Sequence, residues 1–312
     1  MKRLLILAAD AADYAALIEA AALPGLEIVT ATGAQQAAGR GGDCNIILGN
    51  PGMIAAVLAD AQQLEWVQST WAGVDPLCAA GLRRDYVLTG VKGVFGPQMT
   101  VYVITYLFGL ERRVFTMREN QMKRHWQPLP YRHSREITVG FIGLGSIGRH
   151  IARNVRQLGL RVTGLCRSGA ACDEVDEVYA YDHIAEFLRE PDYVVMSLPQ
   201  TPETKGFINA DTLRMMKPSA VLMNVGRGSA IIERDLVEAL RDGLIGGAVL
   251  DVFEQEPLDK ESPLWALPNV FVTAHQAALS FPQDIASIFV ENYRRFLGRE
   301  RLKYVVDFAA GY

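Results

Sequence analysis

Three polar side chains in the second half of the chain are of the types that acid–base chemistry on a small anion requires. Arg227, Glu256 and His275 each come shortly after an apolar run typical of a β-strand. A guanidinium binds a carboxylate through two parallel hydrogen bonds, and an imidazole exchanges protons near neutral pH. Because the carboxyl ends of parallel strands share one edge of a sheet, we expect these residues to converge there although they are far apart in sequence.

A glycine motif upstream predicts what else lies at that edge. The segment 138–152, TVGFIGLGSIGRHIA, runs from an apolar strand through Gly-x-Gly-x-x-Gly into residues with helical spacing. Gly143 allows a sharp turn, Gly145 lets the backbone approach a pyrophosphate, and Gly148 lets the helix pack closely on the strand. Free N–H groups at the start of the helix then face the phosphates. An ordinary turn is the alternative, but a second strand at 161–166 favours a dinucleotide site.

The end of that second strand indicates which dinucleotide binds. An NAD site usually carries Asp or Glu about 20 residues beyond the glycines, to bond the ribose 2′-hydroxyl. Here the sequence is Leu-Cys-Arg-Ser over 165–168, and the first carboxylate is Asp173. Arg167 with the hydroxyl of Ser168 suits a 2′-phosphate, so we expect NADP to be preferred, with NAD possible as a cofactor. The alternative is that Arg167 simply faces solvent.

The elements that must position these residues alternate between strands and helices, which predicts the α/β class with parallel sheets covered on both faces. Helical stretches such as 14–22, 53–61, 233–241 and 282–298 separate the strands. Pro97 opens a longer helical segment that runs to about Met122 and crosses between domains. The expected strands are 4–7, 27–30, 45–48, 66–68, 86–88, 138–142, 161–166, 193–198, 220–225, 247–252 and 270–273.

At 312 residues the chain is long enough for two domains. We expect two doubly wound parallel-sheet domains. One is a Rossmann dinucleotide-binding domain over 99–281, which includes the linker helix. The other is a smaller flavodoxin-like substrate domain made of residues 1–98 plus 282–312.

The ordered series of motifs resembles the D-isomer-specific 2-hydroxyacid dehydrogenases, and within them the glyoxylate/hydroxypyruvate reductases most of all. The resemblance covers nearly the whole chain. It includes the glycine loop, SLPQTPET at 197–204, GRG at 226–228, DVF at 251–253, EPL at 256–258 and His275, and more weakly the segment 69–75.

This resemblance implies roles for the polar residues. Arg227 would hold the substrate carboxylate and polarise the adjacent carbonyl, and His275 would protonate the keto oxygen as hydride arrives. Glu256 would pair with His275; Glu254 is a second candidate, but the family pattern places the acid directly before proline. Trp71, Ala72 and Gly73 would contact the substrate, the last two through backbone N–H groups.

The same resemblance implies further cofactor contacts. We also expect Val225, directly before the Gly-Arg-Gly turn, to contact the cofactor. Pro199 and Thr204 would line the cofactor, and Asp251 would bond the nicotinamide amide. Ser146 and Ile147 would meet the pyrophosphate.

Three departures from the family pattern leave the substrate open. Ala274 stands where proline is usual, Gln276 replaces an apolar residue, and Thr100-Val101 replaces Ala-Glu at the start of the linker helix. The bulky Trp71 favours a small 2-oxo acid such as glyoxylate or hydroxypyruvate. Two alternatives are a non-catalytic nucleotide-sensing protein, like the corepressors of this family, and a dehydrogenase for formate or phosphite.

Composition restricts the partners. A net charge of −4 gives no reason to expect nucleic acid, and no apolar run approaches the roughly 20 residues that span a bilayer. The apolar start of the chain meets Asp10 too early for a signal peptide and is expected to be a strand. Cys44, Cys78, Cys166 and Cys172 show no metal-binding spacing, so we expect free thiols in a reducing cytoplasm and no metal site. The resemblance implies a homodimer formed through the linker-helix region.

Overall fold

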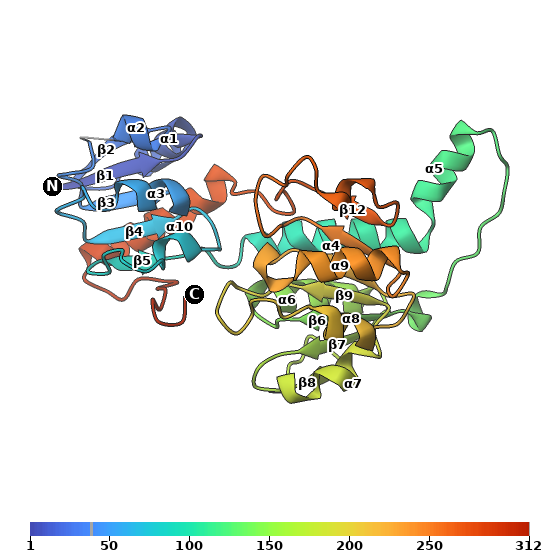
Figure 1. Ribbon diagram of the computed structural model, residues 1–312. Coiled ribbons are helices and arrows are strands. Elements are labelled where there is room, and N and C mark those ends of the chain that lie inside the picture. The colour runs from blue at the N-terminus through green and yellow to red at the C-terminus, as the bar shows by residue number, and fades with distance from the viewer. Residues whose placement is uncertain (38–39, 312) are drawn as a thin grey trace. The chain divides into compact units, whose positions relative to one another are not determined.

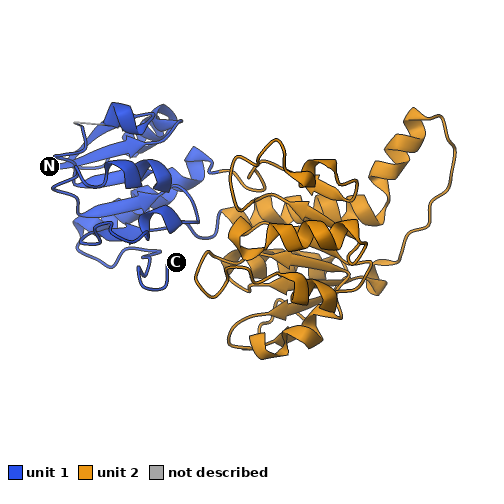
Figure 2. Ribbon diagram, viewed as in Figure 1, with its two compact units in different colours: residues 1–94, 280–312 blue, residues 95–279 orange. Residues whose placement is uncertain are grey.

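The computed structural model describes residues 1–37 and 40–311. The chain divides into two compact units, one made of residues 1–94 and 280–312 and the other of residues 95–279 (Figure 2). The chain passes from one unit to the other after Val94 and again after Leu279, a few residues before the domain boundaries expected from the sequence. Both units have the α/β architecture that the sequence predicts.

The first unit contains a five-stranded parallel sheet in the order β2-β1-β3-β4-β5 (Figure 1). This is the strand order of flavodoxin-like sheets. The central strands are apolar throughout because helices cover both faces; Leu4 to Leu7 in β1 have no solvent exposure. The C-terminal helix α10 completes this unit, where Phe289 stacks on the buried Trp66 with ring centroids 5.1 Å apart. The elements are β1 (Lys2–Leu7), α1 (Ala11–Ala20), β2 (Leu26–Ala31), α2 (Ala34–Ala37), β3 (Ile46–Gly49), α3 (Pro51–Val57), β4 (Trp66–Ser69), β5 (Val87–Thr89) and α10 (Pro282–Leu297).

The second unit contains a seven-stranded parallel sheet in the order β12-β11-β10-β9-β6-β7-β8. The strand order reverses at β6, so the crevice beyond its carboxyl end is the topological switch point where such sheets bind ligands. The register aligns the strand ends there: Ile142 of β6 lies between Leu165 of β7 and Met196 of β9. The strands are β6 (Thr138–Ile142), β7 (Arg161–Leu165), β8 (Glu177–Tyr179), β9 (Tyr193–Met196), β10 (Val221–Asn224), β11 (Gly247–Leu250) and β12 (Val270–Val272). The helices are α4 (Phe95–Glu111), α5 (Val114–Met122), α6 (Ser146–Gln157), α7 (Ile184–Leu188), α8 (Ala210–Met215) and α9 (Glu233–Arg241).

The single helix expected over 97–122 is wrong, because the structure divides it into α4 and α5. Arg113, between them, has a left-handed backbone with φ of 54°, which no α-helix continues through. The apolar stripe of α4 packs into the core of the second unit, whereas no residue of α5 is buried. Figure 1 shows α5 leading away from the sheet and the chain returning as an extended segment.

None of the helices within residues 1–37 and 40–311 is long and apolar enough to cross a membrane. All four cysteines are free thiols. Across the described part of the chain, no group of three or more His, Cys, Asp or Glu side chains is placed to hold a metal ion.

Candidate active site

The glycine loop connects β6 to α6 at the switch point. Gly143 has φ of +96°, which favours glycine. A Cβ on Gly148 would lie 2.1 Å from the Gly143 carbonyl oxygen, so helix and turn can approach this closely only with glycine there. A Cβ on Gly145 would meet no atom within 4 Å, which leaves open space beside the backbone. Gly145 is the N-cap of α6, and Ser146 and Ile147 begin the helix, so their N–H groups have no carbonyl partner within it. This geometry fits the pyrophosphate of a dinucleotide.

Arg167 and Ser168 lie two and three residues after the end of β7, one strand away from the glycine loop. Both are exposed. The Ser168 hydroxyl accepts a hydrogen bond from the Ala170 N–H at 3.3 Å. Hydrogen bonds from its own N–H and from Thr201 lower the pKa of Glu203, and the charge of Arg167 contributes to that shift. The guanidinium therefore lies near the loop that follows β9, at the same edge of the sheet.

The loop after β9 is held by Thr204. Its buried hydroxyl donates to the Pro199 carbonyl at 2.7 Å and accepts from the Thr201 N–H at 2.9 Å. Pro199 is partly exposed at this loop, whereas Val225, directly after β10, is 5% exposed and belongs to the apolar core. The Thr204 side chain thus fixes the shape of a loop at the cofactor edge.

Arg227 lies in a turn that is wedged between two neighbouring loops. A Cβ on Gly226 would lie 2.8 Å from the backbone of Leu198, and one on Gly228 would lie 1.9 Å from the carbonyl carbon of Phe253. The fully buried side chain of Asn224 stabilises the turn. Its Oδ1 accepts from the Gly226 N–H at 3.0 Å, and its Nδ2 donates to the Arg227 carbonyl at 2.9 Å. The two glycines therefore bring the Arg227 backbone close to the loops after β9 and β11.

Glu256 and His275 form a pair. The Nδ1 atom of His275 lies 2.8 Å from Oε2 of Glu256, whose other oxygen accepts from the Phe253 N–H at 3.0 Å. Of the two acids weighed from the sequence, Glu256 makes this contact. Nδ1 is directed at the carboxylate, and an imidazole oriented in this way can act as an acid or a base through Nε2.

The electrostatics of the pair keep Glu256 ionised. Partial burial raises its pKa, but the hydrogen bonds from His275 and from the Phe253 N–H outweigh that effect. The charges of His275 and Arg227 lower the pKa further, so the net shift is below the ordinary value. Arg227 therefore acts electrostatically on the Glu256–His275 pair.

Asp251 fixes the backbone of the loop that carries His275. His275 has φ of 51°, the left-handed region that disfavours residues with a side chain. Its N–H donates to the Asp251 carbonyl at 2.8 Å, and the next two N–H groups, of Gln276 and Ala277, donate to the Asp251 carboxylate at 2.9 Å each. Asp251, expected to bond the nicotinamide amide, is 1% exposed and already binds this run of N–H groups.

A cavity of about 570 Å³ borders the pair. His275 and Glu256 are the titratable groups of its lining, and Phe253, Leu258 and Trp265 are among its apolar residues. A partly apolar cavity with a few titratable groups is the usual form of a small-molecule site.

Trp71, Ala72 and Gly73 belong to the first unit, where they follow the carboxyl end of β4. Trp71 is 37% exposed, and its N–H and carbonyl both bond the Ser69 hydroxyl, at 3.0 and 2.8 Å. Arg227, Glu256 and His275 all belong to the second unit.

Sequence reasoning missed residues that support the site. The sequence pattern places Asn224 and Thr273 only in strands, although a polar residue at the end of an apolar strand is a signal for a buried hydrogen-bonding role. It places Tyr102 only in a helix. No local pattern distinguishes its hydroxyl from that of Tyr106, one turn further along.

Comparisons with known proteins show which family the chain resembles. The family model for the D-isomer specific 2-hydroxyacid dehydrogenase NAD binding domain matches residues 104–277. A D-isomer specific 2-hydroxyacid dehydrogenase family protein from Aeromonas salmonicida subsp. salmonicida A449 is 45% identical, with 98% of this chain and 99% of that one covered and a TM-score of 0.94.

Two further solved structures contain a nicotinamide cofactor. The NADPH-dependent glyoxylate/hydroxypyruvate reductase from Sinorhizobium meliloti, in complex with NADP and sulfate, is 29% identical over the whole of both chains, with a TM-score of 0.89. A D-isomer specific 2-hydroxyacid dehydrogenase from Xanthobacter autotrophicus Py2, in complex with NADPH and MES, is 32% identical over the whole of both chains, also with a TM-score of 0.89. The chain therefore belongs to the D-isomer specific 2-hydroxyacid dehydrogenase family.

Proposed function

We propose that this protein is an NADP-preferring reductase that converts a small 2-oxo acid to the D-2-hydroxy acid. The observation that carries the proposal is the 2.8 Å contact between His275 and Glu256, with the charge of Arg227 acting on the same carboxylate. A proton donor, a partner that holds its tautomer and a cation for the substrate carboxylate are the groups that this reduction requires.

In the proposed mechanism NADPH supplies the hydride when bound. Arg227 binds the substrate carboxylate and polarises the adjacent carbonyl. His275 donates the Nε2 proton to the keto oxygen, while Glu256 accepts from Nδ1–H and stabilises the imidazolium before transfer. We also propose, from the family resemblance, that Ala72 and Gly73 bind substrate through their backbone N–H groups, which makes residues 1–94 and 280–312 the substrate domain.

Two observations support a preference for NADP. Arg167 and Ser168 follow β7 where an NAD site would carry a carboxylate, and relatives have been crystallised with NADP or NADPH. In the proposed site, the backbone at Gly145, Ser146 and Ile147 binds the pyrophosphate, and Gly143 and Gly148 allow the tight turn and close helix packing that place it there. Pro199, Thr204, Val225 and Asp251 complete the remaining cofactor contacts.

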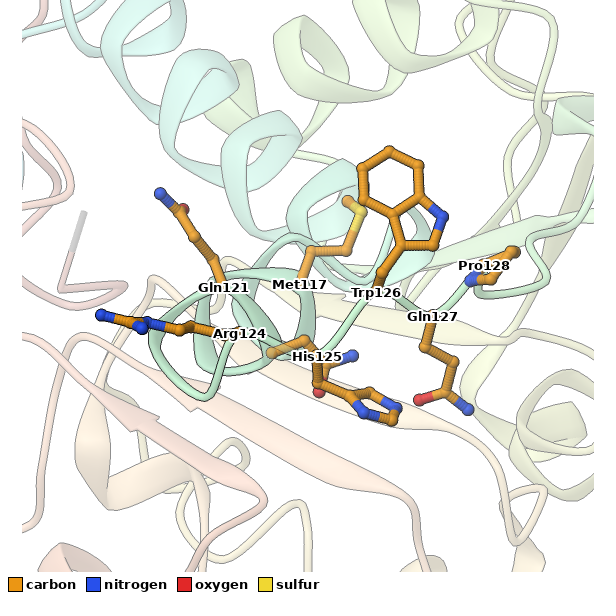
Figure 3. A pocket seen from close by; sticks show the side chains of 8 residues that line it. Met117, Gln121, Arg124, His125, Trp126, Gln127 and Pro128 are labelled. Carbon is orange, nitrogen blue, oxygen red and sulfur yellow. The ribbon is translucent and has the colours of Figure 1, made fainter.

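The substrate class is a proposal from likeness and size. The Sinorhizobium relative is named a glyoxylate/hydroxypyruvate reductase, and Trp71 would narrow the site toward acids of two or three carbons. We further propose a homodimer in a reducing cytoplasm, consistent with the four free thiols. Helix α5 and the segment after it, 123–128, form the dimer surface in this proposal. They border a hollow of about 620 Å³ beside Trp126, which is 97% exposed (Figure 3).

The deciding experiment is a panel of 2-oxo acids assayed by oxidation of NADPH and of NADH. We expect turnover of glyoxylate or hydroxypyruvate with NADPH, and its loss in Arg227→Met, with NADPH binding by fluorescence unchanged. Tight NADPH binding without turnover of any 2-oxo acid would instead indicate a nucleotide sensor. Reduction of NADP by formate or phosphite would indicate the other dehydrogenase alternative.

A further inference from the structure

One face of helix α4 holds both ends of the loop that carries His275. Gln98 and Tyr102 are four residues apart on α4 and so lie on the same side of it. The Gln98 amide donates to the Leu279 carbonyl at 3.0 Å and accepts from the Leu279 N–H at 2.8 Å. The Tyr102 hydroxyl lies 2.7 Å from Oγ1 of Thr273. The segment 273–279, with His275 inside it, is therefore attached to α4 at its two ends.

The direction of the hydrogen bonds at Tyr102 follows from counting protons. The Thr273 hydroxyl donates its single proton to Oδ1 of Asp251 at 2.5 Å, because an ionised carboxylate can only accept. The contact between Thr273 and Tyr102 must then use the phenol proton. Burial raises the pKa of Tyr102 well above its ordinary value, so that proton is retained at neutral pH. The chain of donors runs from Tyr102 to Thr273 to Asp251.

Asp251 transmits this restraint to His275. Its Oδ1 accepts both the Thr273 hydroxyl and the Gln276 N–H, and its Oδ2 accepts the Ala277 N–H. These bonds hold the left-handed backbone at His275, a conformation that persists only where surrounding contacts enforce it. A rotation of the Asp251 carboxylate would change the direction of the imidazole toward Glu256.

We propose that Tyr102 is a positioning residue for His275, acting through the hydroxyl of Thr273 and the carboxylate of Asp251. The inference rests on the proposed function for its catalytic consequence and on the hydrogen bonds alone for its structural one. Tyr102 touches neither substrate nor cofactor in this account. Its hydroxyl keeps Thr273 in the one rotamer that donates to Asp251, and the imidazole is thereby held in line for proton transfer.

The test compares Tyr102→Phe with Tyr106→Phe. Both remove one phenolic oxygen from neighbouring turns of α4, and both keep the ring contact between these residues, whose centroids are 4.9 Å apart. We expect Tyr102→Phe to lower kcat roughly 3- to 30-fold with KM for the 2-oxo acid nearly unchanged. The primary isotope effect of deuterated NADPH on kcat should rise, because proton and hydride transfer become slower relative to product release. Tyr106→Phe should leave all three unchanged.

Amide hydrogen exchange supplies a readout that needs no substrate. In Tyr102→Phe the N–H groups of Gln276 and Ala277 should exchange roughly tenfold faster, with a Tm close to that of the wild type. Thr273→Val should reproduce this result, Thr273→Ser should restore protection, and Tyr102→Phe added to Thr273→Val should cost nothing more.

Unchanged exchange at Gln276 and Ala277 in Tyr102→Phe would overturn the proposal, as would additive effects in the double variant or a loss confined to KM. A wild type that reduces no 2-oxo acid would refute the proposed function instead. The exchange measurement would still decide the role of Tyr102.

Discussion

Gly228 approaches Phe253 so closely that a Cβ on the glycine would lie 1.9 Å from the Phe253 carbonyl carbon and 2.0 Å from its oxygen. The contact joins the turn that carries Arg227 to the loop that leads to Glu256. The distance between the proposed carboxylate-binding group and the partner of His275 therefore depends on the absence of one methyl group.

Gly228→Ala should destabilise the protein and abolish activity. The clash is with backbone and cannot be relieved by a side-chain rotation, so we expect a loss of about 3 kcal/mol or more in the free energy of unfolding, at the upper end for overpacking. Urea denaturation would measure it. Gly33→Ala is the matched control, because a Cβ there meets no atom within 4 Å, and it should be within about 0.5 kcal/mol of the wild type.

Strand ends and glycine spacing were sufficient to predict the class and both parallel sheets, whereas the family followed from the resemblance of the ordered series of motifs. Buried parallel strands are apolar throughout. A glycine or asparagine after such a run, such as Gly143 or Asn224, indicates that a turn begins there. Strand β8 was missed because its three residues, 177–179, include a glutamate and form no apolar run. The left-handed backbone at Arg113 has no signal in the sequence, since neither glycine nor asparagine stands there.

The sequence predicts which strand each candidate site residue follows, but not the hydrogen bonds that orient its side chain. That Arg227, Glu256 and His275 follow β10, β11 and β12 could be inferred, because the pattern gives strand ends. The hydrogen bonds from Thr273 and Tyr102 to the loop of His275 could not, since they join residues up to 171 positions apart and depend on how α4 packs on the sheet. The roles of the site residues stay predictions until the variants below are measured.

Glu256→Gln should lower kcat/KM for the 2-oxo acid roughly 10²-fold or more, because a neutral amide stabilises the imidazolium of His275 poorly. The pKa of Glu256 is below its ordinary value, so its ionised form stabilises the fold above about pH 4.3, and this contribution is lost as the pH falls through the lowered pKa. Wild type and variant should therefore differ in unfolding free energy at pH 6 and converge toward pH 3. A difference that stays constant over this range would contradict the ionised pair.

Arg227→Lys should keep the positive charge but lose the planar guanidinium, which binds a carboxylate through two hydrogen bonds. We expect kcat/KM to fall roughly 10- to 100-fold, the equivalent of one charge-assisted hydrogen bond, with most of the loss in KM. Steady-state kinetics with the best 2-oxo acid would measure it. Arg241→Lys, an exposed arginine in the last turn of α9, should leave the kinetics unchanged.

Arg167→Ala should reduce the preference for NADPH over NADH roughly 10- to 100-fold, because one charge-assisted contact to the 2′-phosphate is lost while NADH has no such phosphate. The ratio of kcat/KM values for the two cofactors reports this directly, and raising the salt concentration should shrink the wild-type preference. An unchanged ratio would show that Arg167 does not bind the 2′-phosphate.

Arg132→Met should destabilise the second unit where the segment after α5 returns to the sheet. The Arg132 guanidinium bonds the buried Glu111, and it lies 3.0 Å from the buried Asp192. Its removal leaves two carboxylates with less compensation. Glu111 keeps the Tyr193 hydroxyl at 2.7 Å and Asp192 keeps Lys217 at 3.2 Å, so we expect a loss of about 2 kcal/mol rather than the larger cost of a fully buried pair.

Adding Glu111→Gln to Arg132→Met should recover part of that stability, because the uncompensated charge is then removed. Urea denaturation of the two single variants and the double variant would give the coupling. Equal stability of Arg132→Met and the wild type would show that Lys217 and the Thr138 N–H, which donates to Asp192 at 2.9 Å, satisfy these carboxylates without the arginine.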